Sequence, residues 1–180
     1  MSGATELLAT GRWAIDPSRT TVGFAIKHML VATVRGRFTD FEGTVERTDD
    51  GLAASGAVRA ASVDTGEPIR DANLRGPGFF DSDRHPEIRF ASERVEPADD
   101  GAVLIAGSIT IAGTTRPLRL HVTVEPDGGP DRARLRARGV LRRSEFGIES
   151  ASLLDSGVSD KVDLLLDVRA RRLDDPPPDK

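Results

Sequence analysis

The sequence predicts an all-β protein, an antiparallel up-and-down barrel, because three observations agree. Apolar and polar residues alternate with period two along several segments, as they do in strands with one buried face. Turn sequences rich in glycine and aspartate separate these segments. Only two segments, 67–75 and 145–154, are suited to short helices.

Each expected strand lies between two turn signals. In 20–27, for example, Val22, Phe24 and Ile26 share one face, while the residues between them are small or polar. The expected strands, in chain order, are 12–16, 20–27, 33–47, 53–63, 87–95, 102–111, 116–126, 131–143 and 159–172.

Long strands joined by tight hairpins favour a barrel of about eight strands, which leaves no sheet edge exposed. A two-sheet sandwich fits the same pattern nearly as well. The inward positions include Ala133, Ala137 and Gly139, and the chain has seven Phe, one Trp and no Tyr. Such small residues favour a barrel that keeps a cavity for a long apolar guest. The alternative is an interior filled by larger side chains.

The chain of 180 residues fits one domain over 11–173, with a flexible segment at 1–10 and a disordered, proline-rich tail at 174–180. The absence of cysteine excludes disulfides and thiolate metal sites. No segment is long enough to span a bilayer, and the N-terminus lacks the features of a secretory signal, so we expect a cytoplasmic protein. No motif predicts a metal, a cofactor or a catalytic residue.

Six arginines lie in 132–143, and their alternation with apolar residues places most of them on the solvent face of one strand. If Val140 lies opposite Leu165, two cross-strand charge pairs follow, Arg142 with Asp163 and Arg138 with Asp167. These pairs would neutralise much of the ladder, and with a net charge of −4 we expect no nucleic-acid partner. Val140 and Leu165 would form an outward apolar spot, which predicts a homodimer contact.

The three histidines lie on different segments. His28 extends the apolar face of 20–27, where it would either contact a ligand head group or bond a backbone carbonyl. His121 lies on a polar face and is expected in solvent. His85 precedes Pro86, which indicates an extended backbone and a structural role in a loop.

Residues 68–92 are the main segment outside the strand pattern, and we expect them to fold over a barrel mouth. Arg70 would bind a polar or phosphorylated head group, or it would pair with Asp71 and hold the loop in place. Phe79 and Phe80 are predicted to form a hydrophobic plug.

Short motifs in a fixed order, over about 13–172, resemble the YceI-like family. The segments that carry the resemblance are Trp13-Ala-Ile-Asp-Pro17, Val22-Gly-Phe-Ala-Ile-Lys-His28, Val34-Arg-Gly-Arg-Phe38, Phe41-Glu-Gly43, Ser62-Val-Asp-Thr-Gly66, Arg70-Asp71, Phe79-Phe80-Asp81, Phe90-Ala-Ser92, Gly107 to Pro117 and Arg143 to Ile148. The resemblance implies a lipocalin-like barrel whose lumen takes a polyisoprenoid or an isoprenoid quinone for carriage, storage or sequestration rather than catalysis. The chain departs from the family pattern at Arg19-Thr20, Asn73, Gly78 and His85, and it lacks two of the family's histidines.

Face pattern and resemblance together predict a set of ligand-binding residues. They are Val22, Phe24, Ile26, His28, Phe38, Arg70, Asp71, Phe79, Phe80, Phe90 and Leu135. Two alternatives remain at this stage. One is an enzyme acting on a lipid-like substrate through His28 with Arg70 or Asp71, and the other is an interaction module with a filled barrel.

Overall fold

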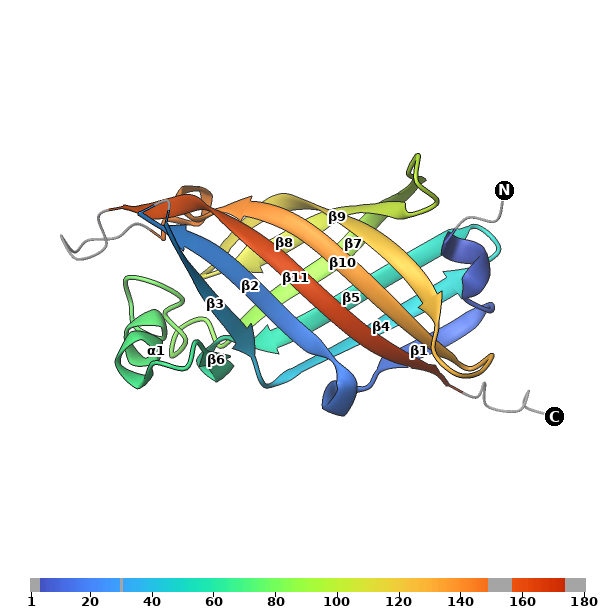
Figure 1. Ribbon diagram of the computed structural model, residues 1–180, viewed down its shortest axis with the longest axis horizontal. Helices are drawn as coiled ribbons and strands as arrows, with labels where there is room; N and C mark the ends of the chain where they lie inside the picture. Colours follow the sequence, from blue (N-terminus) through green and yellow to red (C-terminus); the bar gives the residue numbers. More distant parts are fainter. Residues whose placement is uncertain (1–3, 30, 149–156, 174–180) are drawn as a thin grey trace.

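The computed structural model describes residues 4–29, 31–148 and 157–173, which form an elongated barrel of antiparallel strands (Figure 1). The strands are β1 (Gly11–Ile15), β2 (Thr21–His28), β3 (Ala32–Phe38), β4 (Phe41–Thr48), β5 (Gly51–Arg59), β6 (Val63–Asp64), β7 (Glu87–Pro97), β8 (Val103–Ile111), β9 (Thr114–Pro126), β10 (Arg132–Arg142) and β11 (Val158–Arg172). The helices are α1 (Pro68–Leu74) and the 3-10 helices η1 (Ala4–Leu7), η2 (Pro17–Arg19), η3 (Ala60–Ser62) and η4 (Arg143–Phe146). The helix expected at 67–75 is thus confirmed. The start of the helix expected at 145–154 overlaps η4, which ends at Phe146. Residues 149–154 lie outside the described residues.

The sheet closes on itself. Its order runs β1-β4-β5-β7-β8-β9-β10-β11-β2-β3-β6. One part of β11 also pairs with β1, where Trp13 lies opposite Arg172 and Ile15 opposite Ala170, and this pairing closes the ring of eight strands from β1 to β11. Each pairing of neighbours in this order is antiparallel. The predicted eight-stranded antiparallel barrel is therefore confirmed, and the two-sheet sandwich was the wrong alternative.

Two of the expected strands are interrupted. The strand expected at 33–47 breaks at 39–40, so that β3 pairs with β2 while β4 pairs with β1. At this break the Ser62 hydroxyl accepts the backbone N–H groups of Thr39 at 3.2 Å and Asp40 at 3.1 Å. The strand expected at 53–63 ends at Arg59, and η3 follows it. The hydroxyl of Ser62, the last residue of η3, donates to the carbonyl of Arg59.

One end of the barrel is closed by apolar side chains. Trp13 and Leu8 are fully buried, and the indole N–H of Trp13 donates to the carbonyl of Ala9 at 3.0 Å. Leu8, which follows η1, is part of the core, and the flexibility expected for residues 1–10 stays a prediction. Residues 1–3 and the predicted tail at 174–180 lie outside the described residues.

The register expected between the last two long strands was wrong by two residues. Val140 lies opposite Asp163, and Leu165 lies opposite Arg138. The arginine ladder is partly neutralised, but by other partners: Arg134 with Asp167, Arg136 with Glu125 and Arg142 with Asp160. Val140 is 49% exposed, and the homodimer contact there stays a prediction.

Candidate ligand-binding cavity

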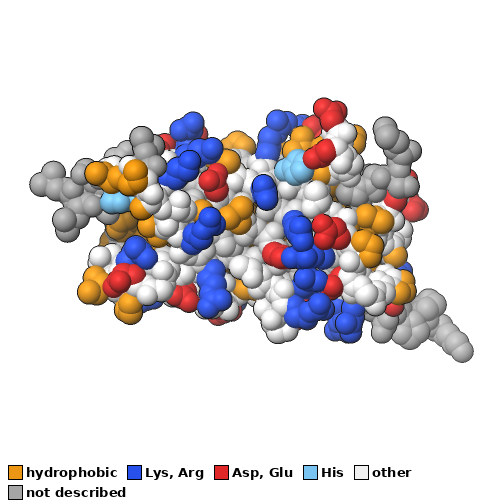
Figure 2. Space-filling model, viewed as in Figure 1, with side chains coloured by type: hydrophobic (Ala, Val, Ile, Leu, Met, Phe, Trp, Pro, Cys, Tyr) orange, Lys and Arg blue, Asp and Glu red, His pale blue; other side chains and the backbone are white. Residues whose placement is uncertain are grey.

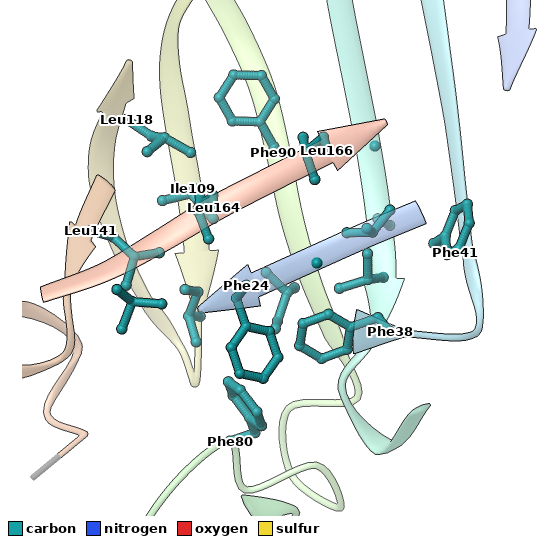
Figure 3. A pocket seen from close by; sticks show the side chains of 18 of the residues that line it. Phe24, Phe38, Phe41, Phe80, Phe90, Ile109, Leu118, Leu141, Leu164 and Leu166 are labelled. Carbon is teal, nitrogen blue, oxygen red and sulfur yellow. The ribbon is translucent and has the colours of Figure 1, made fainter. Parts of the chain in front are cut away.

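The barrel encloses a cavity of about 1040 Å³, at the upper end of the range for small-molecule sites. Its wall comes from nearly every strand and from α1, and most of the lining side chains are apolar (Figure 3). Those labelled in Figure 3 are Phe24, Phe38, Phe41, Phe80, Phe90, Ile109, Leu118, Leu141, Leu164 and Leu166. The interior is therefore not filled by side chains.

Glycines in the wall give the aromatic rings room to lie against it. Phe24 on β2 lies directly opposite Gly36 on β3, and a Cβ on Gly36 would approach the Phe24 ring to less than 3.0 Å. Gly107 on β8 lies opposite Ser92 on β7, two residues from the position opposite Phe90, and two atoms of the Phe90 ring lie 2.8 Å from its ideal Cβ. Because each ring occupies the space over a glycine, two large side chains line the lumen without filling it.

Three phenylalanines gather near α1. The ring centroids of Phe24 and Phe38 are 5.8 Å apart, and those of Phe38 and Phe80 are 5.7 Å apart in an edge-to-face arrangement. Figure 3 shows the Phe80 ring coming from the loop after α1 and pointing towards the other two. The predicted plug thus packs against the wall at the end of the barrel opposite Trp13 (Figure 1).

Thr65 joins α1 to the strand before it. The buried carboxylate of Asp71 accepts the Thr65 backbone N–H at 2.9 Å and its hydroxyl at 2.5 Å. Arg70 donates from Nε to the Thr65 hydroxyl at 2.8 Å and from Nη2 to the Thr65 carbonyl at 3.1 Å. The described residues show no Arg70–Asp71 ion pair, so the expected direct pair is replaced by two sets of bonds to one threonine.

Backbone hydrogen bonds shape the loop that follows α1. The N–H of Phe80 donates to Leu74 at 3.0 Å, and that of Ser82 donates to Arg75 at 3.0 Å. Asp81 takes a left-handed conformation with φ of 49°, and the N–H of His85 donates to its carbonyl at 2.8 Å. These bonds fix the loop that carries Phe79 and Phe80.

Polar anchors hold a second segment at this end. The backbone N–H and the hydroxyl of Ser144, on η4, both donate to Asp160 at 2.8 Å. The backbone bond, with the hydroxyl bond after it, lowers the pKa of the Asp160 carboxyl. Arg143, beside Ser144, lines the cavity and bonds the carbonyl of Ser159 at 3.0 Å. The first two residues of η4 are thus bonded to the start of β11.

The structure places nine of the eleven predicted site residues on the cavity wall, and His28 and Asp71 are not among the lining residues. The wall residues are Val22, Phe24, Ile26, Phe38, Arg70, Phe79, Phe80, Phe90 and Leu135. The Asp71 carboxylate instead accepts the backbone N–H of Thr65. His28, at the end of β2, lies opposite Val158 in the sheet. Contact of the nine with a ligand stays a prediction.

The other two histidines lie at different places in the barrel. His85 packs against the β8–β9 turn, because a Cβ on Gly113 would lie 2.8 Å from its ring. The His121 side chain is 39% exposed, in line with the expected solvent position, and its Nε2 lies 2.9 Å from an oxygen of the exposed Asp100. In the described ranges, no group of three metal-ligating side chains occurs, and no helix is long and apolar enough to cross a membrane.

Sequence reasoning missed much of the wall on the later strands. Leu118 and Leu120 on β9 and Leu164 and Leu166 on β11 line the cavity. Their period-two spacing was visible in the sequence and indicated an inward face, but the predicted set of ligand-binding residues left them out. Phe41 had no such signal, because its position follows from the break between β3 and β4.

Two curated relatives are similar along most of their length. A UPF0312 protein of Photorhabdus laumondii is 27% identical over 180 residues, covering 96% of this chain and 91% of its own. Protein YceI of Shigella flexneri is 31% identical over 155 residues, covering 82% of this chain and 78% of its own.

Solved structures share the fold. BcnA of Burkholderia cenocepacia superposes with a TM-score of 0.78 at 23% identity, covering 86% of this chain and 98% of that one. A polyisoprenoid binding domain from Saccharophagus degradans superposes with a TM-score of 0.69 at 15% identity, covering 89% and 98%. The YceI-like domain model matches residues 13–170, and with this match over most of its length the chain belongs to the YceI-like family.

Proposed function

We propose that this protein binds a long apolar small molecule, such as a polyisoprenoid, an isoprenoid quinone or a similar lipid, in the barrel lumen, for carriage, storage or sequestration. The observation that carries the proposal is the apolar cavity of about 1040 Å³, which Trp13 and Leu8 close at one end. A relative of the same fold is named a polyisoprenoid binding domain, which supports this class of ligand.

Apolar burial would supply the affinity. Each buried methylene contributes about 0.8 kcal/mol, so about ten carbons would contribute roughly 8 kcal/mol. Association and ordering cost about 4–15 kcal/mol, so short chains would bind poorly and long ones well. Because the lumen is lined by Val, Leu, Ile and Phe, we expect the affinity to depend on the length of the ligand's apolar chain rather than on a particular pattern of polar groups.

The polar end of the ligand would lie beside α1. Thr65, Arg70 and Asn73 line the cavity at this end, whereas Trp13 and Leu8 close the other. The two bonds from Arg70 to Thr65 hold its guanidinium in place, and a fixed guanidinium suits an oxygen-bearing head group. The chain would thus enter tail first.

Binding is favoured over catalysis by the placement of the candidate acid–base residues. The enzyme hypothesis needs His28 together with Arg70 or Asp71 beside the substrate. His28 is not among the residues that line the cavity, and the Asp71 carboxylate is engaged by Thr65. The proposal therefore assigns no catalytic residue.

Organic extraction of the purified, natively folded protein, followed by mass spectrometry, tests the proposal. An unrelated protein purified in parallel serves as the control. A stoichiometric polyprenyl, quinone or fatty-chain species is expected in the extract. If the extract is empty and the ligand-free protein also takes up no polyprenol or quinone added in solution, the proposal is wrong.

A further inference from the structure

Three exposed apolar side chains surround the open end of the barrel. Met29 is 58% exposed, Val31 91% and Ile69 74%, and these belong to only five large apolar side chains that the described residues leave exposed. Met29 and Val31 lie on the turn between β2 and β3, and Ile69 lies on α1, both at the left in Figure 1. We call Met29, Val31 and Ile69 the entrance rim.

One residue of the entrance rim, Ile69, also belongs to the cavity wall. Ile69 is exposed to solvent and also lines the cavity, so it stands at the opening itself. Figure 2 shows hydrophobic side chains at both ends of this face, including the end that carries the rim. The opposite end carries η1 and the buried Trp13 instead, so an apolar molecule has its route to the lumen on the rim side.

Positive charge accompanies the rim. The segment 27–37 contains Lys27, Arg35 and Arg37 and no acidic residue, although the whole chain has a net charge of −4. Arg37 pairs with Asp64 at 3.5 Å, whereas Lys27 and Arg35 are exposed and, among the described residues, pair with no carboxylate. The β2–β3 hairpin is therefore a basic element on an acidic protein.

We propose that the entrance rim docks on the surface of a lipid bilayer that contains anionic phospholipids. Met29, Val31 and Ile69 would enter the headgroup region, while Lys27 and Arg35 would meet the anionic headgroups. The inference rests on the proposed function, because a ligand of that class is dissolved in membranes and would pass directly between bilayer and lumen. The small number of apolar and basic groups makes the docking reversible.

Sedimentation with vesicles tests this docking. Ligand-loaded protein is mixed with vesicles of phosphatidylcholine alone or of phosphatidylcholine with phosphatidylglycerol. The protein should sediment with the anionic vesicles, and added salt should release it because salt screens the basic hairpin. Val31→Asp should lower the vesicle partition coefficient about tenfold, since it places a carboxylate at the most exposed position of the rim.

Matched control variants lie at the closed end. Leu7 on η1 is 50% exposed, so Leu7→Asp makes the same kind of change away from the entrance. Arg35→Glu should weaken binding to anionic vesicles, whereas Arg132→Glu at the start of β10 should not. Equal losses in the rim variants and their controls would overturn the proposal.

Ligand retention, measured by native mass spectrometry on each variant, separates this inference from the proposed function. Val31 does not line the cavity, so the Val31→Asp variant should retain its ligand but bind vesicles more weakly. If ligand-loaded protein does not sediment with anionic vesicles, the docking proposal is wrong, but the proposed function is unaffected. A dimer that Val31→Asp dissociates would also overturn it, because a second copy would then cover the rim.

Discussion

The ring of Phe80 stands edge-on to the ring of Phe38, with 5.7 Å between their centroids. Phe38 belongs to β3, and Phe80 belongs to the loop after α1, which backbone hydrogen bonds hold in shape. This contact links the loop to the barrel wall at the entrance. If the proposed ligand occupies the lumen, we expect Phe80 to slow its exit.

Phe80→Ala should speed ligand dissociation about tenfold, because an aromatic pair contributes about 0.5–1.5 kcal/mol and a tenfold change in rate is about 1.4 kcal/mol. Phe80→Leu keeps an apolar side chain at the entrance and should have a smaller effect. Dissociation of a fluorescent polyprenyl analogue into excess acceptor measures both rates. Unchanged dissociation in Phe80→Ala would mean that the loop does not restrict exit.

Gly36→Ala should reduce the cavity without unfolding the barrel. The three atoms nearest to the added Cβ would all belong to the ring of Phe24, which must then turn into the lumen. Ligand affinity should fall, and Phe24→Leu in the same chain should restore it, since the smaller side chain vacates the space. Gly107→Ala is the contrast, because its Cβ would also meet the backbone carbonyl of Ala91 and should lower stability. Titration with the analogue and thermal melts of all three variants distinguish the two effects.

Ile26→Trp should obstruct ligand binding, since Ile26 lines the cavity and indole adds considerable volume. Thr21→Trp is the matched control, because Thr21 is on the same strand but exposed. A fall in affinity of tenfold or more, about 1.4 kcal/mol, is expected for Ile26→Trp alone. Equal affinities for the two variants would contradict the proposed lumen.

Asp71→Ala should destabilise the fold by about 1–3 kcal/mol, because it leaves the N–H and hydroxyl of Thr65 without their buried acceptor. Asp71→Asn retains one acceptor oxygen and should lose less. Urea unfolding followed by circular dichroism gives both values. If the two variants were equally stable, the carboxylate would not be the group that holds α1 to β6.

Acid should remove part of the stability through Asp167. Hydrogen bonds from Arg134 lower the pKa of the Asp167 carboxyl in the folded protein. Its contribution is thus present above the unfolded pKa of about 3.9 and disappears as the pH falls through the lower folded value. Asp167→Asn should lower the Tm near neutral pH by up to about 3 °C, given solvent screening, and by nothing in strong acid.

The control for this pH dependence is Asp163→Asn, on the same strand, where the nearest cation is the Lys161 ammonium at 4.0 Å. Its melting curve should follow the wild type at each pH. A pH-independent deficit in Asp167→Asn would assign the effect to packing rather than charge.

Strand alternation was sufficient to assign side chains to the two faces of the wall. Phe24 and Leu135 were predicted inward from period two alone, and both line the cavity. The register of β10 against β11 was not predictable in the same way, because a shift of two residues keeps each side chain on its face. The long connection between these strands, which includes η4, supplied no turn geometry to choose between the alternatives.

By itself, the sequence determined the all-β class, the inward faces and the small residues that leave a lumen, since these depend on local periodicity and side-chain volume. Only the tertiary structure decided which end is closed, where the strand at 39–40 breaks and which residues meet at the entrance. Leu8 with Trp13, Ser62 with Thr39, and Phe80 with Phe38 are each distant in the chain or joined by irregular backbone. Such contacts form only when the barrel closes. Closure depends on the registers of all the strand pairs together, so no single segment of the sequence predicts these contacts.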